Sequence, residues 1–114
     1  MSESLRLRRA EQALRQRLGP VLAEHGIGLE HWLVLAALSE TPGLRMSDLA
    51  EAAVVPPATL TRHVDRLVQT ALVVRRIDAE DRRIALVALS TLGEALVAQL
   101  KAAEERAQAD RVNS

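Results

Sequence analysis

The chain has 114 residues and a mass of 12.4 kDa, enough for one modest hydrophobic core and short of the size at which a second becomes common. It lacks cysteine, which excludes disulfides, thiolate chemistry and cysteine-based zinc sites, and no apolar run approaches the roughly 18 residues of a membrane span. The N-terminus lacks the apolar core of a signal peptide, so we expect a cytoplasmic protein.

The formal net charge is zero, which argues against a nucleic-acid partner, but the charges are segregated along the chain. Residues 19–55 carry one arginine against five acidic residues, whereas residues 56–89 carry six arginines against four. Of the 15 cations 14 are arginine, the side chain suited to bidentate phosphate or guanine contacts and to narrow minor grooves. This distribution favours anion recognition.

Helical periodicity dominates the first third of the chain. Residues 4–25 predict one helix, which Pro20 is expected to kink. Gly26 and Gly28 then bracket a tight link into residues 29–40, which predict a second helix. Because that segment is apolar nearly all round, with Leu29, Trp32, Leu33, Leu35, Ala36 and Leu38, we expect it to be buried.

Two shorter helices are predicted next. Residues 44–46 are a candidate edge strand, and Ser47 is the expected N-cap of the third helix. The fourth helix starts at Pro57, because a first helical residue needs no N–H and proline already has the right φ. Its apolar stripe is Leu60, Val64, Leu67, Val68 and Ala71, and its opposite face is Ala58, Thr59, Arg62, Arg66 and Gln69.

The pattern then changes to that of a β-hairpin. Residues 72–77 and 84–89 are rich in Val, Leu and Ile, and the link DAEDRR between them is highly charged. Ser90 is the expected N-cap of a last helix, whose Ala-, Glu- and Arg-rich end we expect to fray unless a partner covers it. Three short helices followed by a hairpin is the order of a winged helix-turn-helix, a fold that binds duplex DNA.

The residues themselves resemble the MarR family of transcriptional regulators. The resemblance covers residues 26–96, from GLEHWLVLAAL to LSTLGEAL, and the wing segment DAEDRR followed by VALSTLG is close to the family's Asp-x-Arg wing with its Leu-Thr and Gly. It implies an α+β, mostly α, winged helix-turn-helix at residues 26–90. The flanking helices, residues 1–25 and 91–114, would be dimerisation helices, the second of them shortened relative to the family.

In this fold the fourth helix is the recognition helix, which lies in the DNA major groove. Its candidate DNA-binding residues are Thr59, Arg62 and Arg66 on the outer face, with Thr61 and His63 on the flanks. We expect Asp65 to stay out of the groove, or to pair with Arg62 or Arg66.

The hairpin, or wing, supplies four more candidate DNA-binding arginines. Asp81 is expected to hold Arg82 or Arg83 while the other extends into the minor groove. The resemblance favours Arg83 for that position, but the residues alone leave the choice open. Because side chains alternate along a strand, one of Arg75 and Arg76 should face the DNA.

Other chemistries find little support. The three histidines fit no metal-ligand spacing, and there is neither a nucleophile with an arranged base nor a phosphate loop, so we expect no enzyme, cofactor or metal site. The resemblance implies a small aromatic or phenolic effector bound between the dimer helices and the DNA-binding lobe. His25 and Trp32 are candidate ligand-binding residues there, although Trp32 is better suited to the core than to a ligand site.

The sequence therefore predicts a transcriptional regulator, most simply a repressor that binds a palindromic operator on double-stranded DNA as a homodimer and is released by a small ligand. The alternative is a protein-interaction module that acts through a partner regulator. The two hypotheses differ in whether the purified protein alone binds a palindrome.

Overall fold

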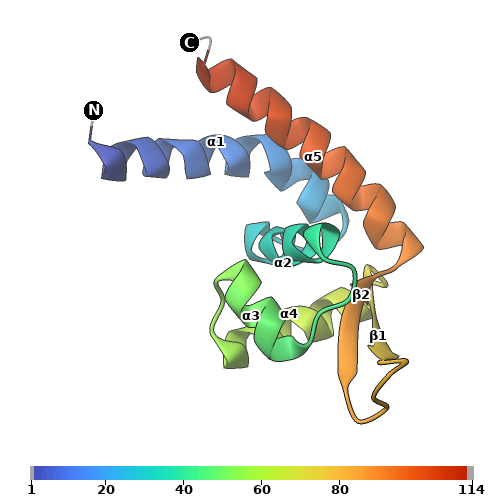
Figure 1. The fold of residues 1–114 in the computed structure, drawn as a ribbon. Coiled ribbons are helices and arrows are strands. Elements are labelled where there is room, and N and C mark those ends of the chain that lie inside the picture. The colour runs from blue at the N-terminus through green and yellow to red at the C-terminus, as the bar shows by residue number, and fades with distance from the viewer. Residues whose placement is uncertain (1, 113–114) are drawn as a thin grey trace.

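The computed structural model describes residues 2–112 as five helices and a two-stranded hairpin (Figure 1). In chain order the elements are α1 (Glu3–Glu24), α2 (Leu29–Glu40), α3 (Met46–Ala53), α4 (Pro57–Gln69), β1 (Val73–Ile77), β2 (Ala85–Leu89) and α5 (Thr91–Val112). Helices α1 and α5 pack on each other at one end, and α2 lies between them and the lobe made by α3, α4 and the hairpin. The predicted winged helix-turn-helix with flanking helices is confirmed.

The core is aliphatic, as the composition predicted. It is a single cluster, built largely of leucine, valine and alanine with Trp32, and the described residues contain no buried polar or charged side chain. Its most deeply buried side chains come from every helix and both strands: Leu18, Leu22, Leu35, Leu49, Leu60, Val64, Leu67, Val73, Val87 and Leu100. One shared core therefore fixes the hairpin and the recognition helix α4 relative to α1 and α5.

Three helices end in the same left-handed turn. After α1, Gly26 has φ 70°, and the N–H of Ile27 bonds back to the carbonyl of Leu22 at 3.1 Å. After α3 and α4 the corresponding positions are Val54, with φ 56°, and Ala71, with φ 63°. Glycine adopts this conformation freely, whereas Val54 and Ala71 are strained in it.

The hairpin is antiparallel, with Val73 opposite Leu89 and Ile77 opposite Ala85. The expected edge strand before α3 is reduced to one residue, Leu44, whose N–H and C=O bond to Val87 at 3.0 and 2.8 Å. This short bridge ties the turn after α2 to the wing.

The junction between α4, the hairpin and α5 is tightly packed. The Ser90 hydroxyl accepts the N–H of Gly93 at 3.0 Å, as expected of an N-cap, and donates to the carbonyl of Ala71 at 2.6 Å. Gly93 is buried in the first turn of α5, where an added Cβ would overlap the carbonyl oxygen of Leu72. The start of α5 is thus locked against the end of α4.

Several sequence-based details were wrong. Ser47 is not an N-cap: α3 begins at Met46, so Arg45 takes the cap position without a side-chain hydrogen bond. Leu33 is 47% exposed although most of α2 is buried, because it lies on the outer side of that helix. In the stripe of α4, Val68 is 36% exposed and Ala71 lies beyond the end of the helix.

Candidate nucleic-acid interface

The N-terminal half of α4 presents an outer face that the other described residues leave available. Pro57 is the first helical residue, as predicted, and Ala58 and Arg62 are exposed while Thr59 is half-buried. The exposed Thr61 donates its hydroxyl to the carbonyl of Pro57 at 3.1 Å. Within residues 2–112 the Arg62 guanidinium has no hydrogen-bond or ion-pair partner, so all five of its N–H donors are free for a ligand.

The C-terminal half of α4 is occupied by contacts within the protein. The Nε and Nη2 atoms of Arg66 both donate to the carbonyl of Gly26, at 3.1 and 2.9 Å, and Nη1 donates to the Gln69 side chain at 3.2 Å. The His63 ring stands edge-on to that of His31, with the ring centroids 4.7 Å apart. Arg66 and His63 thus both face the junction of α1 and α2.

Asp65 is held by the wing. Its carboxylate accepts a hydrogen bond from Arg75 Nη2 at 2.6 Å, so the expected alternative of pairing with Arg62 or Arg66 was wrong. Arg75 lies opposite the buried Val87 in the hairpin register, which places it on the face directed at α4. The pair joins the recognition helix to β1 across ten residues of sequence.

Arg76 lies on the other face of the hairpin. It lines a hollow of about 400 Å³ between the end of α2, the hairpin and the start of α5, together with Ser39, Glu94 and Lys101. Of the two strand arginines, Arg75 is therefore the one on the recognition-helix side.

The wing tip is organised by Asp81. Its carboxylate accepts two hydrogen bonds from the Arg83 guanidinium, at 3.0 and 2.9 Å, and a third from the Arg83 backbone N–H at 3.0 Å. The guanidinium, followed by that N–H, lowers the pKa of Asp81, and the carboxylate in turn raises the pKa of Arg83. The Arg83 side chain is still 89% exposed, so the contact orients it without withdrawing it from solvent.

Arg82 has a different environment. It is exposed and lines a hollow at the wing tip with Ile77, Asp78 and Ala79. Asp81 thus holds Arg83 and leaves Arg82 without that contact, and which of the two arginines enters a minor groove stays a prediction.

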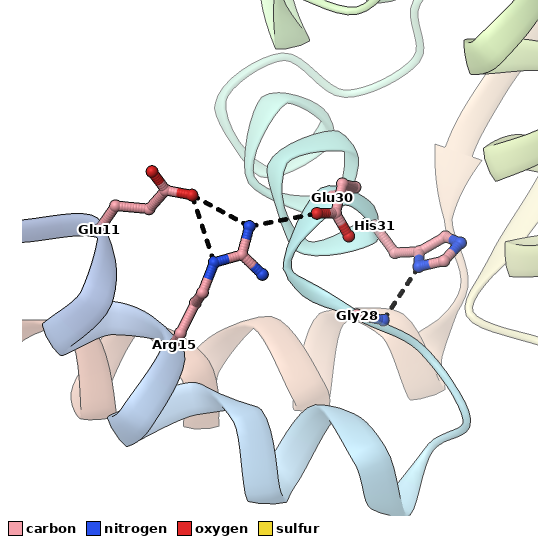
Figure 2. A network of polar contacts seen from close by, with 5 residues as sticks. All are labelled: Glu11, Arg15, Gly28, Glu30 and His31. Carbon is pink, nitrogen blue, oxygen red and sulfur yellow. Dashed lines mark hydrogen bonds and ion pairs between the residues drawn. The ribbon is translucent and has the colours of Figure 1, made fainter. Parts of the chain in front are cut away.

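Polar contacts also fix the first turn of α2 (Figure 2). Arg15 on α1 bonds to Glu11 at 3.0 Å and to Glu30 at 3.3 Å, while the N–H of Gly28 donates to Nδ1 of His31 at 3.0 Å. A hydrogen bond from its own backbone N–H, and then Arg15, lower the pKa of Glu30 against the effect of desolvation. Burial, followed by the neighbouring His63, lowers the pKa of His31.

The two candidate ligand-binding residues lie apart. Trp32 is 3% exposed and belongs to the core, although its edge lines a hollow of about 230 Å³ between α2 and α5 that includes Glu40 and Lys101. His25 is the C-cap of α1 and is not one of the described residues that line this hollow.

Among residues 2–112, no group of three or more His, Asp or Glu side chains is arranged to hold a metal ion. In the same part of the chain, none of the helices by itself combines the length and the apolar composition that a membrane span requires.

Sequence reasoning missed the contacts that occupy the second half of α4. The bond from Arg66 to Gly26 spans 40 residues and ends on a backbone carbonyl, which leaves no mark in the sequence. The contact between His31 and His63 likewise depends on the packing of α2 against α4.

Comparison with known proteins agrees with this geometry. The sequence model of the MarR family matches residues 25–84. The chain is 33% identical over 87 residues to the transcriptional repressor MdtR of Bacillus subtilis, covering 73% of the present chain and 56% of that protein.

Two solved structures share the fold at somewhat lower identity. NadR in complex with 4-hydroxyphenylacetate superposes with a TM-score of 0.77 and 28% identity, over 98% of this chain and 79% of that one. A mutant MarR of E. coli complexed with operator DNA superposes with a TM-score of 0.70 and 28% identity, over 82% of this chain and 64% of that one. The relatives are transcriptional regulators, not enzymes, and the present chain belongs to the MarR family.

Proposed function

We propose that this protein is a transcriptional repressor that binds duplex DNA, with the N-terminal half of α4 in the major groove and the wing in the adjacent minor groove. The observation that carries the proposal is the guanidinium of Arg62 on the outer face of α4, which has no partner among the residues that the structure describes. A free guanidinium there suits guanine O6 and N7 or a phosphate. Arg83, exposed and oriented by Asp81, is the proposed minor-groove residue.

The related proteins support this assignment. MdtR is a transcriptional repressor, and the MarR structure contains operator DNA. Because both share this chain's fold or sequence over most of its length, a DNA-binding role in the cytoplasm is the simplest inference for this protein.

We further propose that the protein binds DNA as a homodimer. The first turns of α1 extend beyond the core, leaving Leu5 51% and Leu7 60% exposed (Figure 1). Exposed leucines on a projecting helix are typical of an interface, because their burial is favourable. A two-fold dimer would present two α4 helices to half-sites about 34 Å apart.

A small aromatic or phenolic acid is the proposed effector. NadR binds 4-hydroxyphenylacetate, an aromatic carboxylate. In this chain the hollows beside α5 share Lys101, and the larger one is also lined by Arg76, by Glu94 and by apolar side chains. Its two cations outnumber its one carboxylate, which suits an aromatic anion, and binding there would act on the wing through β1.

The proposal is tested by selecting bound duplexes from a randomised library with the purified protein alone. Enrichment of an inverted repeat is expected, and sedimentation should give the mass of a dimer on DNA. The Arg62→Ala variant is the matched control and should return a weaker motif. If the wild type enriches nothing even at low salt, the autonomous repressor is excluded, and action through a partner regulator becomes the better hypothesis.

A further inference from the structure

The second half of the recognition helix contacts the loop between α1 and α2 through its side chains. We name this set of contacts the clasp: Arg66 and His63 on α4, Gly26 and Gly28 in the loop, and His31 in the first turn of α2. None of these contacts lies on the outer face of the N-terminal half of α4. The clasp connects the helix proposed to read DNA with the helices proposed to form the dimer.

Arg66 is the first half of the clasp. Two of its nitrogens converge on one oxygen, the carbonyl of Gly26, while a third is held by Gln69, so the planar guanidinium is fixed from both sides. Two features of the Gly26 position favour glycine. Its φ of 70° favours glycine, and an added Cβ would lie 2.9 Å from Arg66 Nη2.

The histidine pair is the second half. Nδ1 of His31 accepts the N–H of Gly28, so the neutral ring carries its proton on Nε2 and can gain a second proton only by losing that bond. The resulting cation would stand beside His63 and Arg66, with Glu30 as the opposing charge and Arg15 already bonded to Glu30. Protonation and the clasp are therefore in competition.

We propose that Arg66 and His63 are positioning residues: they hold the C-terminal half of α4 against the α1–α2 loop, and protonation of His31, which breaks its bond to Gly28, loosens this hold. Arg66 then contributes to DNA binding through the orientation of α4, and not by touching a base or a phosphate. The effect on DNA rests on the function proposed above, whereas the clasp itself can be tested without DNA.

The DNA-free test is an NMR titration of the histidine rings in the full chain. Replacing His63 with Gln, or Arg66 with Ala, removes a neighbouring positive charge, so the His31 midpoint should rise in both variants. Arg62→Ala, one turn earlier on α4, is the matched control and should leave it unchanged. An unchanged midpoint in both clasp variants would overturn the proposal.

The DNA test compares how affinity depends on salt. Arg66→Ala should weaken binding about threefold to tenfold. The slope of log affinity against log salt concentration and the base preference should both stay as in the wild type, because no ionic contact to DNA is lost. Arg66→Lys should recover only part of the loss, since one ammonium cannot reproduce the fork on the Gly26 carbonyl. A slope smaller by about one would instead make Arg66 a phosphate contact, and relaxed preference at one base pair would make it a base contact; either result contradicts the proposal.

The proton dependence gives the last test. Wild-type affinity should fall as the pH drops from about 7.5 to about 5.5, and the fall should begin at a higher pH in His63→Gln, because His31 gains its proton more readily in that variant. His25→Gln, which changes a histidine outside the clasp, is the control and should retain the full fall at the wild-type pH. Equal pH profiles in wild type and His63→Gln would refute the protonation step.

Discussion

The two halves of α4 are used differently, although they belong to one continuous amphipathic helix. The first half, up to Arg62, turns its polar face outward, and no residue in the described part of the chain pairs with that guanidinium. In the second half His63, Asp65 and Arg66 are committed to α2, the wing and the α1–α2 loop. Arg62 and Arg66 are four residues apart on one face, yet within residues 2–112 Arg62 has no partner, whereas the guanidinium of Arg66 bonds to Gly26 and Gln69. Helical position alone therefore does not identify a DNA contact.

The largest expected effect comes from disrupting the packing between the end of α4 and the start of α5, which holds both halves of α4 in place. Gly93→Ala would force a methyl group onto the carbonyl of Leu72, just beyond the end of α4, and should lower the free energy of unfolding by about 3 kcal/mol or more. Urea denaturation measures this loss. Gly19→Ala in α1 is the control, because nothing lies within 4 Å of its added Cβ; a comparable loss there would show that the Gly93 packing is not special.

Replacing Arg62 tests whether the first half of α4 reads DNA. Arg62→Ala should reduce affinity for the selected duplex by about 1–3 kcal/mol and relax the preference at one base pair if the side chain reads a base. Stability should hardly change, since Arg62 has no partner within the described chain. Fluorescence anisotropy with single-base variants of the duplex provides the measurement, and wild-type affinity in the mutant would remove Arg62 from the interface.

A smaller effect is expected where α4 ends. Ala71 has φ 63°, so Ala71→Gly should relieve strain and raise the free energy of unfolding by about 0.5–1 kcal/mol, after allowance for the greater freedom of glycine in the unfolded chain. Thermal denaturation should show the gain, with base preference unaltered. A loss of stability would mean that the left-handed turn costs nothing in this protein.

The smallest effect concerns pH. The pKa of His31 is lowered in the folded protein from its ordinary value of 6.5, so the folded state binds fewer protons than the unfolded state just below that pH. This contribution to stability is complete above about pH 6.5 and is lost as the pH falls toward the folded-state pKa. Because the ring is only half-buried, solvent screening limits it to less than about 1 kcal/mol. Urea midpoints of wild type and His31→Gln should differ in slope over this pH range, and parallel curves would contradict the assignment.

Much of the fold could be predicted because local signals determined it. Pro57 and Ser90 mark helix starts through their own backbone or hydroxyl chemistry, and the hairpin strands were placed within one residue of their observed bounds. Ser47 misled because a serine near a helix start need not be the cap: α3 starts one residue too early for its hydroxyl.

The candidate site was less predictable, for a physical reason. Periodicity finds which side chains leave the core, but it cannot say what they meet outside it. The partner of Arg66 is a carbonyl 40 residues away, and that of Asp65 lies in the next element. The wing pair, Asp81 with Arg83, lies close enough in sequence to be expected, and even there the choice of arginine required the structure.

The most direct test of the account is to repeat the duplex selection with Arg62→Ala and Arg66→Ala side by side with the wild type. We expect Arg62→Ala to lose preference at the base pair that Arg62 reads, and Arg66→Ala to return the wild-type motif at lower affinity. The reverse pattern, with the motif intact in Arg62→Ala and degraded in Arg66→Ala, would contradict the division of the recognition helix into a reading half and a clasped half.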